Sequence, residues 1–389
     1  MLSAHVLVTG PYHDLRRYLL DRSCQELVCT WHPLEPFASA GERRSGCEQY
    51  RRGQRVFLQS CRQPPLPGGT LFELLLFAWH ALLTTWWGIT RGGGATVLVA
   101  INPLNAFTGL LLRQLGCVRR VVYYVIDYVP TRYPNRWLNQ LYHSIDRHCV
   151  RHADHVWNLS SRMVQAREAR GLPACFRERQ ITVPIGTDLR IQPLTPDRVD
   201  RQVIVYFGGL MEKQGVQLAI EALAELRRTV PRARLLVIGG GDVDRARSLQ
   251  QLAASLGVSE AVEFTGVIRD HDEALKRIRR CAVGVAPYTD DPDNFTRYTD
   301  PGKPKAYMAA GLPVVMTDVP EVAQLIAHAG AGFVVPYEAR AFATALERLL
   351  TDELLFATCK SRARQLAEEY DWHKIFDRAF EALDAISQN

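Results

Sequence analysis

The hydrophobic residues of this chain gather in short apolar runs, and helical stretches separate one run from the next. Clear runs are 95–101 (ATVLVAI), 121–126 (VVYYVI), 203–207 (VIVYF) and 234–238 (RLLVI). Most are followed by turn residues and then by a segment whose apolar positions recur every three or four residues. Continuous apolar strands that alternate with helices are typical of a parallel sheet covered on both faces. The pattern therefore predicts an α/β protein.

The alternation runs through the 389 residues twice. It starts with a strand predicted at 5–9 and breaks at 190–201 (RIQPLTPDRVDR), a polar stretch with two prolines that is typical of a linker. It ends in helical runs at 339–350, 353–369 and 374–387. We therefore expect a first domain at 1–189, a linker at 190–201, a second domain at 202–372, and a C-terminal helix at 373–389 that packs back on the first domain.

Two segments of the first half depart from the alternation. Residues 33–69 are rich in Pro, Gly and Arg and give little periodic signal. Residues 71–89 (LFELLLFAWHALLTTWWGI) have nearly the 20 apolar residues that a transmembrane helix needs. Glu73 and His80 interrupt them, which favours a buried or interfacial helix. The tryptophans in this run leave contact with a membrane surface open, because Trp prefers such boundaries.

The net charge of +6 is unevenly distributed. Residues 1–189 hold 22 Arg, no Lys and 13 acidic residues, a net charge of +9, and the remainder carries −3. The basic half is either an ordinary solvated surface, or it attracts an anionic membrane or substrate. No basic-aromatic motif supports nucleic-acid binding.

The nine cysteines are scattered, odd in number and without a CxxC pair. They predict neither a disulfide framework nor a zinc site, and they favour a reducing compartment. The N-terminus shows no basic-then-apolar leader. We expect a cytoplasmic protein, and a peripheral position on the inner face of the membrane stays open.

Ligands of open α/β sheets bind at the carboxyl ends of the strands, where the noteworthy loops of this chain are predicted. The sharpest is 300–317 (DPGKPKAYMAAGLPVVMT). Gly302 precedes a short helix whose free N–H groups and positive dipole end suit a phosphate, and Lys303 adds a charge. The alternative is an ordinary loop, helix, turn and strand. Two such sheets facing each other predict a cleft with one substrate per domain.

The second half resembles the retaining glycosyltransferases of family four. The resemblance is carried by 184–189 (PIGTDL), 206–223 (YFGGLMEKQGVQLAIEAL), 235–242 (LLVIGGGD), 262–268 (VEFTGVI), the block 286–317 and 368–376 (EEYDWHKIF). It implies the GT-B fold, with two Rossmann-like doubly wound domains facing across a cleft and a C-terminal helical tail. The first half matches by architecture only, as expected for a domain that binds a variable acceptor.

The resemblance also implies which residues hold a nucleotide-diphosphate sugar. The donor-binding positions are Gly208, Gly209, Gly241, Val267, Arg269, Pro301 and Gly302. Lys213 and Lys303 would neutralise the diphosphate, with solvated lysines as the alternative. No metal and no cofactor besides the sugar nucleotide is expected.

The sequence departs from the family's pattern at the donor site. Gly209 replaces an arginine, and Gln214 replaces a lysine, with Lys213 one place earlier. Tyr298 and Ala306 stand where the family has a pair of glutamates that contact sugar and ribose. Asp300, or an aspartate among 290–293, is the candidate for the sugar contact, and a solvated acidic loop is the alternative.

In the first domain the candidates lie in YYVIDYVPTRYPNRW (123–137). Asp127 is a candidate general base or sugar-orienting group. The alternative is a helix cap or an ion pair with Arg132. Gly10, His13, Asn102 and Arg132 are candidates for the acceptor side of the cleft.

These observations favour a transferase that moves a sugar from a nucleotide donor to a hydroxyl of a glycan or a lipid-linked glycan, with retention. An inverting transferase or a nucleotide-sugar epimerase on the same fold is the alternative among enzymes. A non-catalytic nucleotide-sugar-binding subunit is the alternative that Tyr298 and Ala306 suggest.

Overall fold

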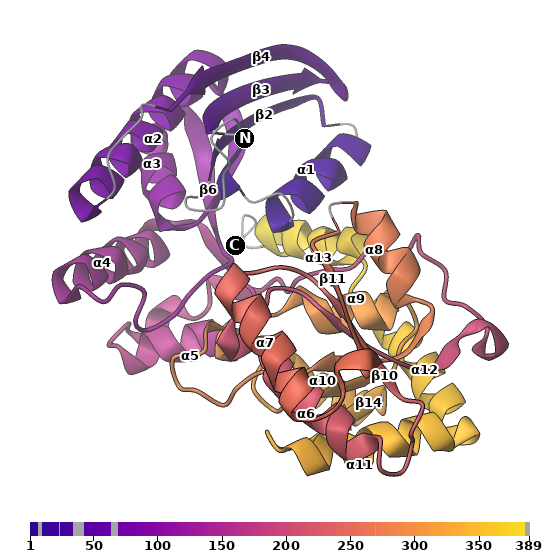
Figure 1. The fold of residues 1–389 in the computed structure, drawn as a ribbon. Helices are drawn as coiled ribbons and strands as arrows, with labels where there is room; N and C mark the ends of the chain where they lie inside the picture. The colour runs from indigo at the N-terminus through magenta and orange to yellow at the C-terminus, as the bar shows by residue number, and fades with distance from the viewer. Residues whose placement is uncertain (7–9, 23, 34–42, 64–68, 269, 386–389) are drawn as a thin grey trace. The chain divides into compact units, whose positions relative to one another are not determined.

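The computed structural model describes residues 1–6, 10–22, 24–33, 43–63, 69–268 and 270–385. The chain divides into two compact units, Met1–Val183 with Phe376–Asn389, and Pro184–Ile375. Figure 1 colours the chain from one terminus to the other and labels its elements. Each unit is an α/β layer structure built around its own sheet, as the apolar pattern predicts.

The first unit holds an eight-stranded sheet in the described part of the chain, in the order β4-β3-β2-β1-β5-β6-β7-β8. Its strands are β1 (Leu2–Val6), β2 (Glu26–Pro33), β3 (Arg44–Arg51), β4 (Gln54–Arg62), β5 (Ala95–Ile101), β6 (Val118–Val125), β7 (His155–Asn158) and β8 (Gln180–Thr182). Its helices are α1 (Pro11–Asp21), α2 (Thr70–Arg91), α3 (Pro103–Gln114), α4 (Arg136–His152), α5 (Ser161–Ala169) and most of α13 (Trp372–Ala385).

The segment 33–69, which gives little periodic signal in the sequence, contains strands β3 and β4. β2 and β3 pair antiparallel, as do β3 and β4, so the first sheet is parallel from β2 to β8 and antiparallel at one edge. β4 is the edge strand and most of its residues are exposed, including the apolar Val56 and Leu58. The apolar alternation that announces a half-buried strand is therefore weak there.

The apolar segment 71–89 forms α2, a helix of 22 residues. Among the described residues no helix combines the length and the apolar character needed to cross a membrane.

The second unit has a six-stranded sheet, counted over the described residues, whose paired strands all run parallel. Its order is β11-β10-β9-β12-β13-β14, so the strand order reverses between β9 and β12. The strands are β9 (Asp200–Phe207), β10 (Arg234–Ile238), β11 (Val262–Gly266), β12 (Cys281–Ala286), β13 (Val314–Met316) and β14 (Gly332–Val334). The helices are α6 (Val216–Leu226), α7 (Val243–Ser255), α8 (His271–Ile278), α9 (Gly302–Ala309), α10 (Val322–Ala329), α11 (Ala339–Thr351) and α12 (Glu353–Glu368).

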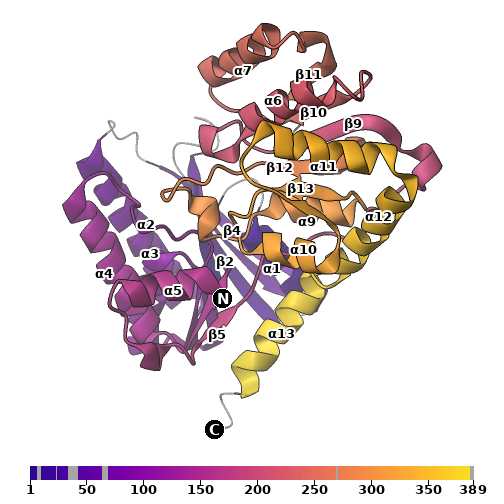
Figure 2. The ribbon, with the colours of Figure 1, turned by 90° about the horizontal axis from the view of Figure 1, so that it is seen from below.

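Both faces of this sheet are covered, as Figure 2 shows from below. Ile204 and Tyr206 of β9 belong to one core cluster, and Val205 between them belongs to the other. Alternate residues of a strand point to opposite faces, so both faces of β9 are buried.

The boundary between the units lies at Pro184, six residues before the predicted linker. Ile185 N–H donates to Asp300 at 2.7 Å, and Thr187 N–H donates to the Tyr370 carbonyl at 2.7 Å. These hydrogen bonds attach 184–189 to the second unit. The expected linker is also packed there, because Arg364 donates to the Ile191 carbonyl and Val199 belongs to the core.

Candidate functional site

The switch point of the second sheet gathers the glycine loops that follow β9, β10 and β11. Gly208, directly after β9, has φ +141° and donates to the Ile238 carbonyl at 2.9 Å. A Cβ at Gly239 would lie 1.8 Å from the Gly208 carbonyl oxygen, and one at Gly240 would lie 2.3 Å from Val267 Cγ2. The loops thus touch each other only because these positions lack side chains. They leave backbone exposed at the carboxyl edge, where ligands of such sheets bind.

Lys303 reaches this switch point from the first turn of α9. A Cβ at Gly208 would lie 3.1 Å from Lys303 Cε, and the Lys303 ammonium lies 3.9 Å and 4.9 Å from the ring centroids of Tyr206 and Tyr288. Among the described residues, no carboxylate lies within ion-pairing distance of this buried ammonium. Its hydrogen-bond acceptor is Gln214 Oε1 at 3.3 Å.

The electrostatics of Lys303 favour an anionic ligand. Burial lowers the pKa of Lys303 well below its usual value, because the charged form loses hydration that no acid replaces. The aromatic faces compensate in part through cation–π attraction. The interaction of an anion with a buried ammonium that has no acidic partner is more favourable than its interaction with a solvated lysine.

The N-terminus of α9 adds backbone donors to the same place. Pro301 is its N-cap residue and provides no side-chain cap, so the amides of the first turn lack that partner. Gly302 is exposed at the first helical position. Free N–H groups and the positive end of the helix dipole bind phosphate.

The surroundings of Gln214 explain why a glutamine stands at this position, where the family has a lysine. Its side chain is buried beside Lys303 and accepts a hydrogen bond from it, where a second lysine would repel it. Lys213, the predicted phosphate ligand, is exposed, and its ammonium lies 3.0 Å from Asp291 Oδ2. The structure therefore brings Lys303 and Gln214 together and directs Lys213 to the acidic loop.

Asp300 occupies a buried ion pair. Its Oδ2 accepts from the Lys305 ammonium and from Ile185 N–H, and Lys305 also donates to the Ile185 carbonyl at 2.7 Å. Burial raises the pKa of Asp300, and the neighbouring ammonium opposes that shift. These contacts join the turn at 184–186 to the start of α9, a structural role that the sequence prediction of a sugar contact did not include.

The remaining donor-side predictions occupy different environments. Val267 is exposed beside Gly240, and Gly241 packs against Leu210. Gly209 lies in the turn, with its carbonyl accepting from the Tyr206 hydroxyl at 2.5 Å. Arg269 lies outside the described residues.

In the first unit Asp127 and Arg132 form an ion pair, the alternative that the sequence left open. The Arg132 side chain is 34% exposed and the Asp127 side chain is 40% exposed. Burial alone would lower the pKa of Arg132, and Asp127 reverses that effect and raises it. The Asp127 carbonyl also accepts from the Tyr142 hydroxyl at 3.2 Å. The pair lies after β6, at the carboxyl edge of the sheet.

Gly10, His13 and Asn102 lie at helix starts beside β1 and β5. Gly10 is the N-cap of α1, and His13 N–H donates to the Gly10 carbonyl at 2.9 Å. Asn102 caps α3 with φ +76°, an uncommon value for a residue other than glycine. Its Nδ2 lies 3.0 Å from His5 Nδ1.

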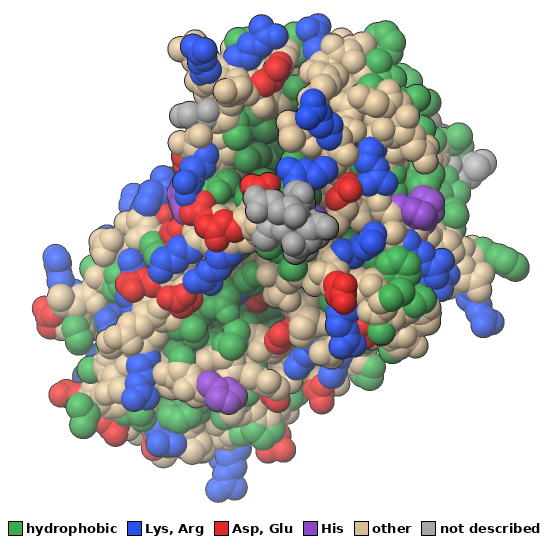
Figure 3. All heavy atoms as spheres, turned by 180° about the vertical axis from the view of Figure 1, so that it is seen from behind, with side chains coloured by type: hydrophobic (Ala, Val, Ile, Leu, Met, Phe, Trp, Pro, Cys, Tyr) green, Lys and Arg blue, Asp and Glu red, His purple; other side chains and the backbone are tan. Residues whose placement is uncertain are grey.

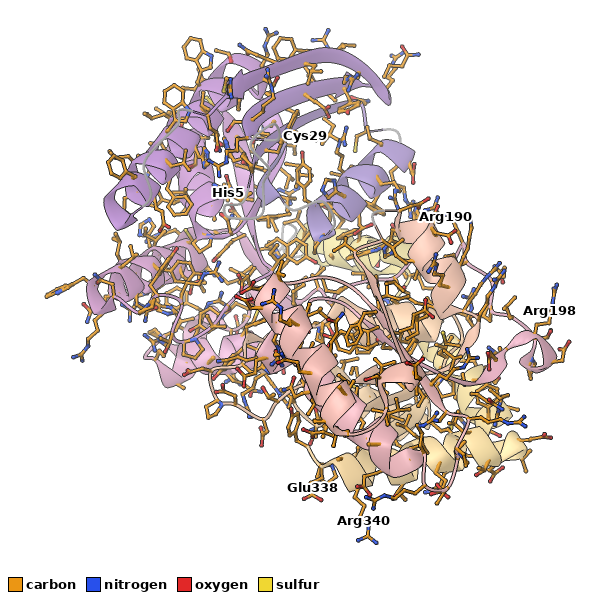
Figure 4. All side chains as sticks on the ribbon, in the orientation of Figure 1. His5, Cys29, Arg190, Arg198, Glu338 and Arg340 are labelled. Carbon is orange, nitrogen blue, oxygen red and sulfur yellow. The ribbon has the colours of Figure 1, made fainter. Side chains whose placement is uncertain are left out.

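His5 belongs to a buried cluster with His32 and His80, which sequence reasoning did not identify. Figure 4 labels His5 inside the first unit. His5 Nε2 lies 3.0 Å from His80 Nδ1, and the His32 and His80 rings stack with centroids 4.4 Å apart. Burial lowers the pKa of His5 to about 4 and that of His80 to about 3. All three are hydrogen-bonded to side chains, and no metal-binding group of His, Cys, Asp or Glu occurs among the described residues.

Sequence reasoning also missed Tyr206 and Tyr288. The Tyr288 hydroxyl is buried and has no hydrogen-bond partner within the described ranges. The available signal was an aromatic residue at or near the end of each of the two strands, β9 and β12, that flank the switch point.

The nine cysteines are free thiols, as their spacing predicted. On the face seen in Figure 3, basic side chains are spread among acidic and apolar ones and form no single patch.

Comparison with known proteins agrees with this geometry. Residues 201–352 match the family described as "Glycosyl transferases group 1", and residues 12–186 match the "Glycosyl transferase 4-like domain". Each half of the chain thus matches a glycosyltransferase domain family, and the predicted GT-B fold class is confirmed.

The curated relatives match about half of the chain or less. The D-inositol 3-phosphate glycosyltransferase of Stackebrandtia nassauensis is 29% identical over 49% of this chain and 43% of its own length. The phosphatidyl-myo-inositol mannosyltransferase of Mycolicibacterium smegmatis is 26% identical over 53% of this chain and 52% of its own. A second M. smegmatis enzyme, a GDP-mannose-dependent α-(1-6)-phosphatidylinositol monomannoside mannosyltransferase, is 44% identical over 17% of each chain. The chain thus spans about half or less of the length of these relatives.

Solved structures match over nearly the whole length and show the fold. Anabaena Alr3699/HepE in complex with UDP has a TM-score of 0.69, with 17% identity over 99% of both chains. Sucrose-phosphate synthase from Thermosynechococcus elongatus has a TM-score of 0.71, with the same identity and coverage.

Proposed function

We propose that this chain transfers a sugar from a nucleoside diphosphate sugar to a hydroxyl group of a glycan or a lipid-linked glycan. The observation that carries the proposal is Lys303, a buried ammonium between two tyrosine rings with no acidic partner among the described residues. It lies beside the Gly208 turn and in the first turn of a helix that lacks a side-chain cap. A diphosphate supplies the anion that each of these features favours.

In the proposed reaction the bond between the anomeric carbon and the phosphate oxygen breaks. Negative charge then grows on the departing nucleoside diphosphate, and Lys303 and the first amides of α9 stabilise it. The acceptor hydroxyl oxygen forms the new bond to the anomeric carbon, and its proton passes to the leaving phosphate. Retention of configuration follows the resemblance to family four. Gly208 and Gly209 let the backbone approach the diphosphate closely.

On the acceptor side we propose that Asp127 and Arg132 act as a pair. Arg132 engages the Asp127 carboxylate, so the pair suits hydrogen bonding to acceptor hydroxyls better than it suits a free general base. Support for a lipid-linked acceptor comes from the two mycolicibacterial relatives, which are named for phosphatidylinositol substrates. Asn102 and His13 lie at the carboxyl edge of the same sheet and remain proposed acceptor contacts.

A donor screen tests the proposal. UDP, GDP and other nucleoside diphosphates are titrated by calorimetry, and release of diphosphate from the matching sugar nucleotides is then measured. We expect one diphosphate to bind and its sugar nucleotide to turn over. Lys303→Met should lower both the affinity and the turnover by at least about tenfold. Lys276→Met, a matched change of an exposed lysine on α8, should leave them unchanged.

Two outcomes would contradict the proposal in different ways. Binding without turnover on water or any acceptor would make the chain a non-catalytic sugar-nucleotide-binding subunit, the reading that Tyr298 and Ala306 favour. Failure of every nucleoside diphosphate to bind would remove the donor site itself.

A further inference from the structure

Helix α2 turns polar side chains toward the interior of the first unit and apolar side chains toward solvent. An ordinary surface helix buries its apolar stripe and exposes polar residues. In α2 the polar residues His80 and Thr84 are buried, and they lie on the face toward the sheet. Leu82 and Trp86 face outward, with 65% and 61% of their surface exposed.

Specific hydrogen bonds fix this orientation. His80 Nδ1 lies 3.0 Å from His5 Nε2 of β1, and Thr84 Oγ1 lies 2.7 Å from His32 Nε2 of β2. Trp87 Nε1 donates to Gln59 Oε1 of β4 at 3.1 Å. A rotation of α2 that buried the apolar stripe would break all three contacts and leave buried polar groups unpaired, at a cost of about 1–3 kcal/mol for each group.

The exposed apolar residues of α2 form one continuous stripe. They are Leu75, Trp79, Leu82, Trp86 and Ile89, spaced at the three- and four-residue intervals that place side chains on one helix face. The stripe runs along most of the 22-residue helix.

Helix α3 adds a second apolar stripe. Phe107, Leu111 and Leu115 are exposed at four-residue spacing. The two helices pack together, since a Cβ at Gly88 of α2 would lie 2.4 Å from Leu112 of α3, and both views of the ribbon show them side by side (Figures 1 and 2). We call these eight residues the α2–α3 face. Monomeric proteins rarely expose contiguous apolar patches of more than a few hundred Å².

The segment that contains α2, α3 and the neighbouring helix α4 has a positive net charge. Residues 70–152 carry eight arginines, no lysine and three acidic residues. Asp127 and Asp146 are paired with Arg132 and Arg167. Two of the eight arginines, Arg113 and Arg120, are paired with Asp154 and Asp384, which lie outside this segment. A positive surface around exposed Trp and Leu complements anionic lipid, and Trp prefers the lipid–water boundary.

We propose that the α2–α3 face rests on the surface of an anionic lipid bilayer, with α2 lying along the boundary and its apolar stripe among the headgroups. Helices of this kind lie in the plane of the interface and do not span it. The inference goes beyond the proposed sugar transfer and does not depend on it, because the face belongs to the first unit and the donor residues belong to the second.

The test is sedimentation with vesicles of phosphatidylcholine alone or mixed with phosphatidylglycerol. The wild-type chain should bind the mixed vesicles, less so at high salt. Leu82→Ser with Trp86→Ser should lower the bound fraction by at least about tenfold. The control is Leu354→Ser, which changes an even more exposed leucine of α12 in the second unit and should bind as the wild type does. Nucleotide binding, measured without vesicles, should be the same in all three proteins.

Brominated lipids supply a readout that needs no variant. They should quench the tryptophan fluorescence of the wild-type chain, because Trp79 and Trp86 would enter the headgroup region. Absence of vesicle binding by the wild type, or equal binding by the Leu82 and Trp86 variant, would overturn the proposal. A dimer seen by light scattering, broken by the same variant and without vesicle binding, would overturn it in favour of an interface between two copies.

Discussion

The Lys303 ammonium lies 3.9 Å from the centroid of the Tyr206 ring, and its hydrogen-bond acceptor is the Gln214 amide oxygen at 3.3 Å. The neighbours of this ammonium are neutral groups, so they offset only part of the free-energy cost of burying its charge. A bound anion would offset more of that cost. Lys303→Met should therefore lower the affinity for the cognate nucleoside diphosphate by at least about tenfold, or 1.4 kcal/mol. Affinity for the nucleoside without phosphates should change little, and calorimetry measures both.

The same experiment contains a protonation test. Burial lowers the pKa of Lys303, and a bound diphosphate would raise it, so binding should take up protons at pH values between the two. Titrations in buffers of different ionisation enthalpy reveal this uptake. Equal loss of affinity for nucleoside and diphosphate in Lys303→Met would place the lysine away from the phosphates.

Gly239→Ala should destabilise the second unit and disturb the donor turn. Gly239 has φ +148°, and an added Cβ would lie 1.8 Å from the Gly208 carbonyl oxygen. We expect a loss of about 1–3 kcal/mol in the free energy of unfolding, together with weaker nucleotide binding. Gly257→Ala is the matched control, since Gly257 also has positive φ but open space around its Cα. Equal effects of the two changes in urea unfolding would show that backbone strain alone matters.

Asp300→Ala should unfold the second unit more easily because it leaves Lys305 buried and unpaired. Removal of one partner of a buried ion pair typically costs about 3–5 kcal/mol. The double change Asp300→Ala with Lys305→Met should recover part of that loss, because no uncompensated charge remains. Urea unfolding of the single and double variants measures the coupling. A stable but inactive Asp300→Ala protein would instead support the sugar contact predicted from the sequence.

The histidine cluster should make the first unit sensitive to acid. Its folded-state pKa values are depressed, to about 4 for His5 and about 3 for His80, whereas an unfolded histidine titrates near 6.5. The stabilising contribution is therefore fully present above pH about 6.5 and falls as the pH drops toward 4, since unfolding then takes up protons. Each histidine contributes a slope of about 1.4 kcal/mol per pH unit in that window.

Unfolding free energies measured between neutral pH and pH about 4 test this dependence. His80→Gln should reduce the slope by the share of one histidine. His328→Gln, which changes an exposed histidine of α10, should leave it unchanged. A wild-type stability that does not vary across this window would show that the cluster is already charged or is not buried.

The sequence determined the layer structure and the place of Lys303 at the start of a helix. Strand 95–101, helix 216–226 and the start of α9 follow from local apolar patterns and from Gly302 and Lys303, which act within a few residues of themselves. The alternation predicted both α/β units for the same reason.

Only the tertiary structure decided which ion-pair and hydrogen-bond partners the candidate site residues have. The ion pairs of Asp300 and Asp127, and the contact of Lys303 with Gln214, depend on which of several nearby charged groups come together in three dimensions. The orientation of α2 depends on His5 and His80, 75 residues apart in the chain, so its apolar composition indicated a helix but not which face meets solvent. Strand β3 likewise pairs with β2, and β4 pairs with β3, although their own sequence pattern gave little sign of strands. Contacts between distant residues carry no local periodicity, so the sequence alone leaves them open.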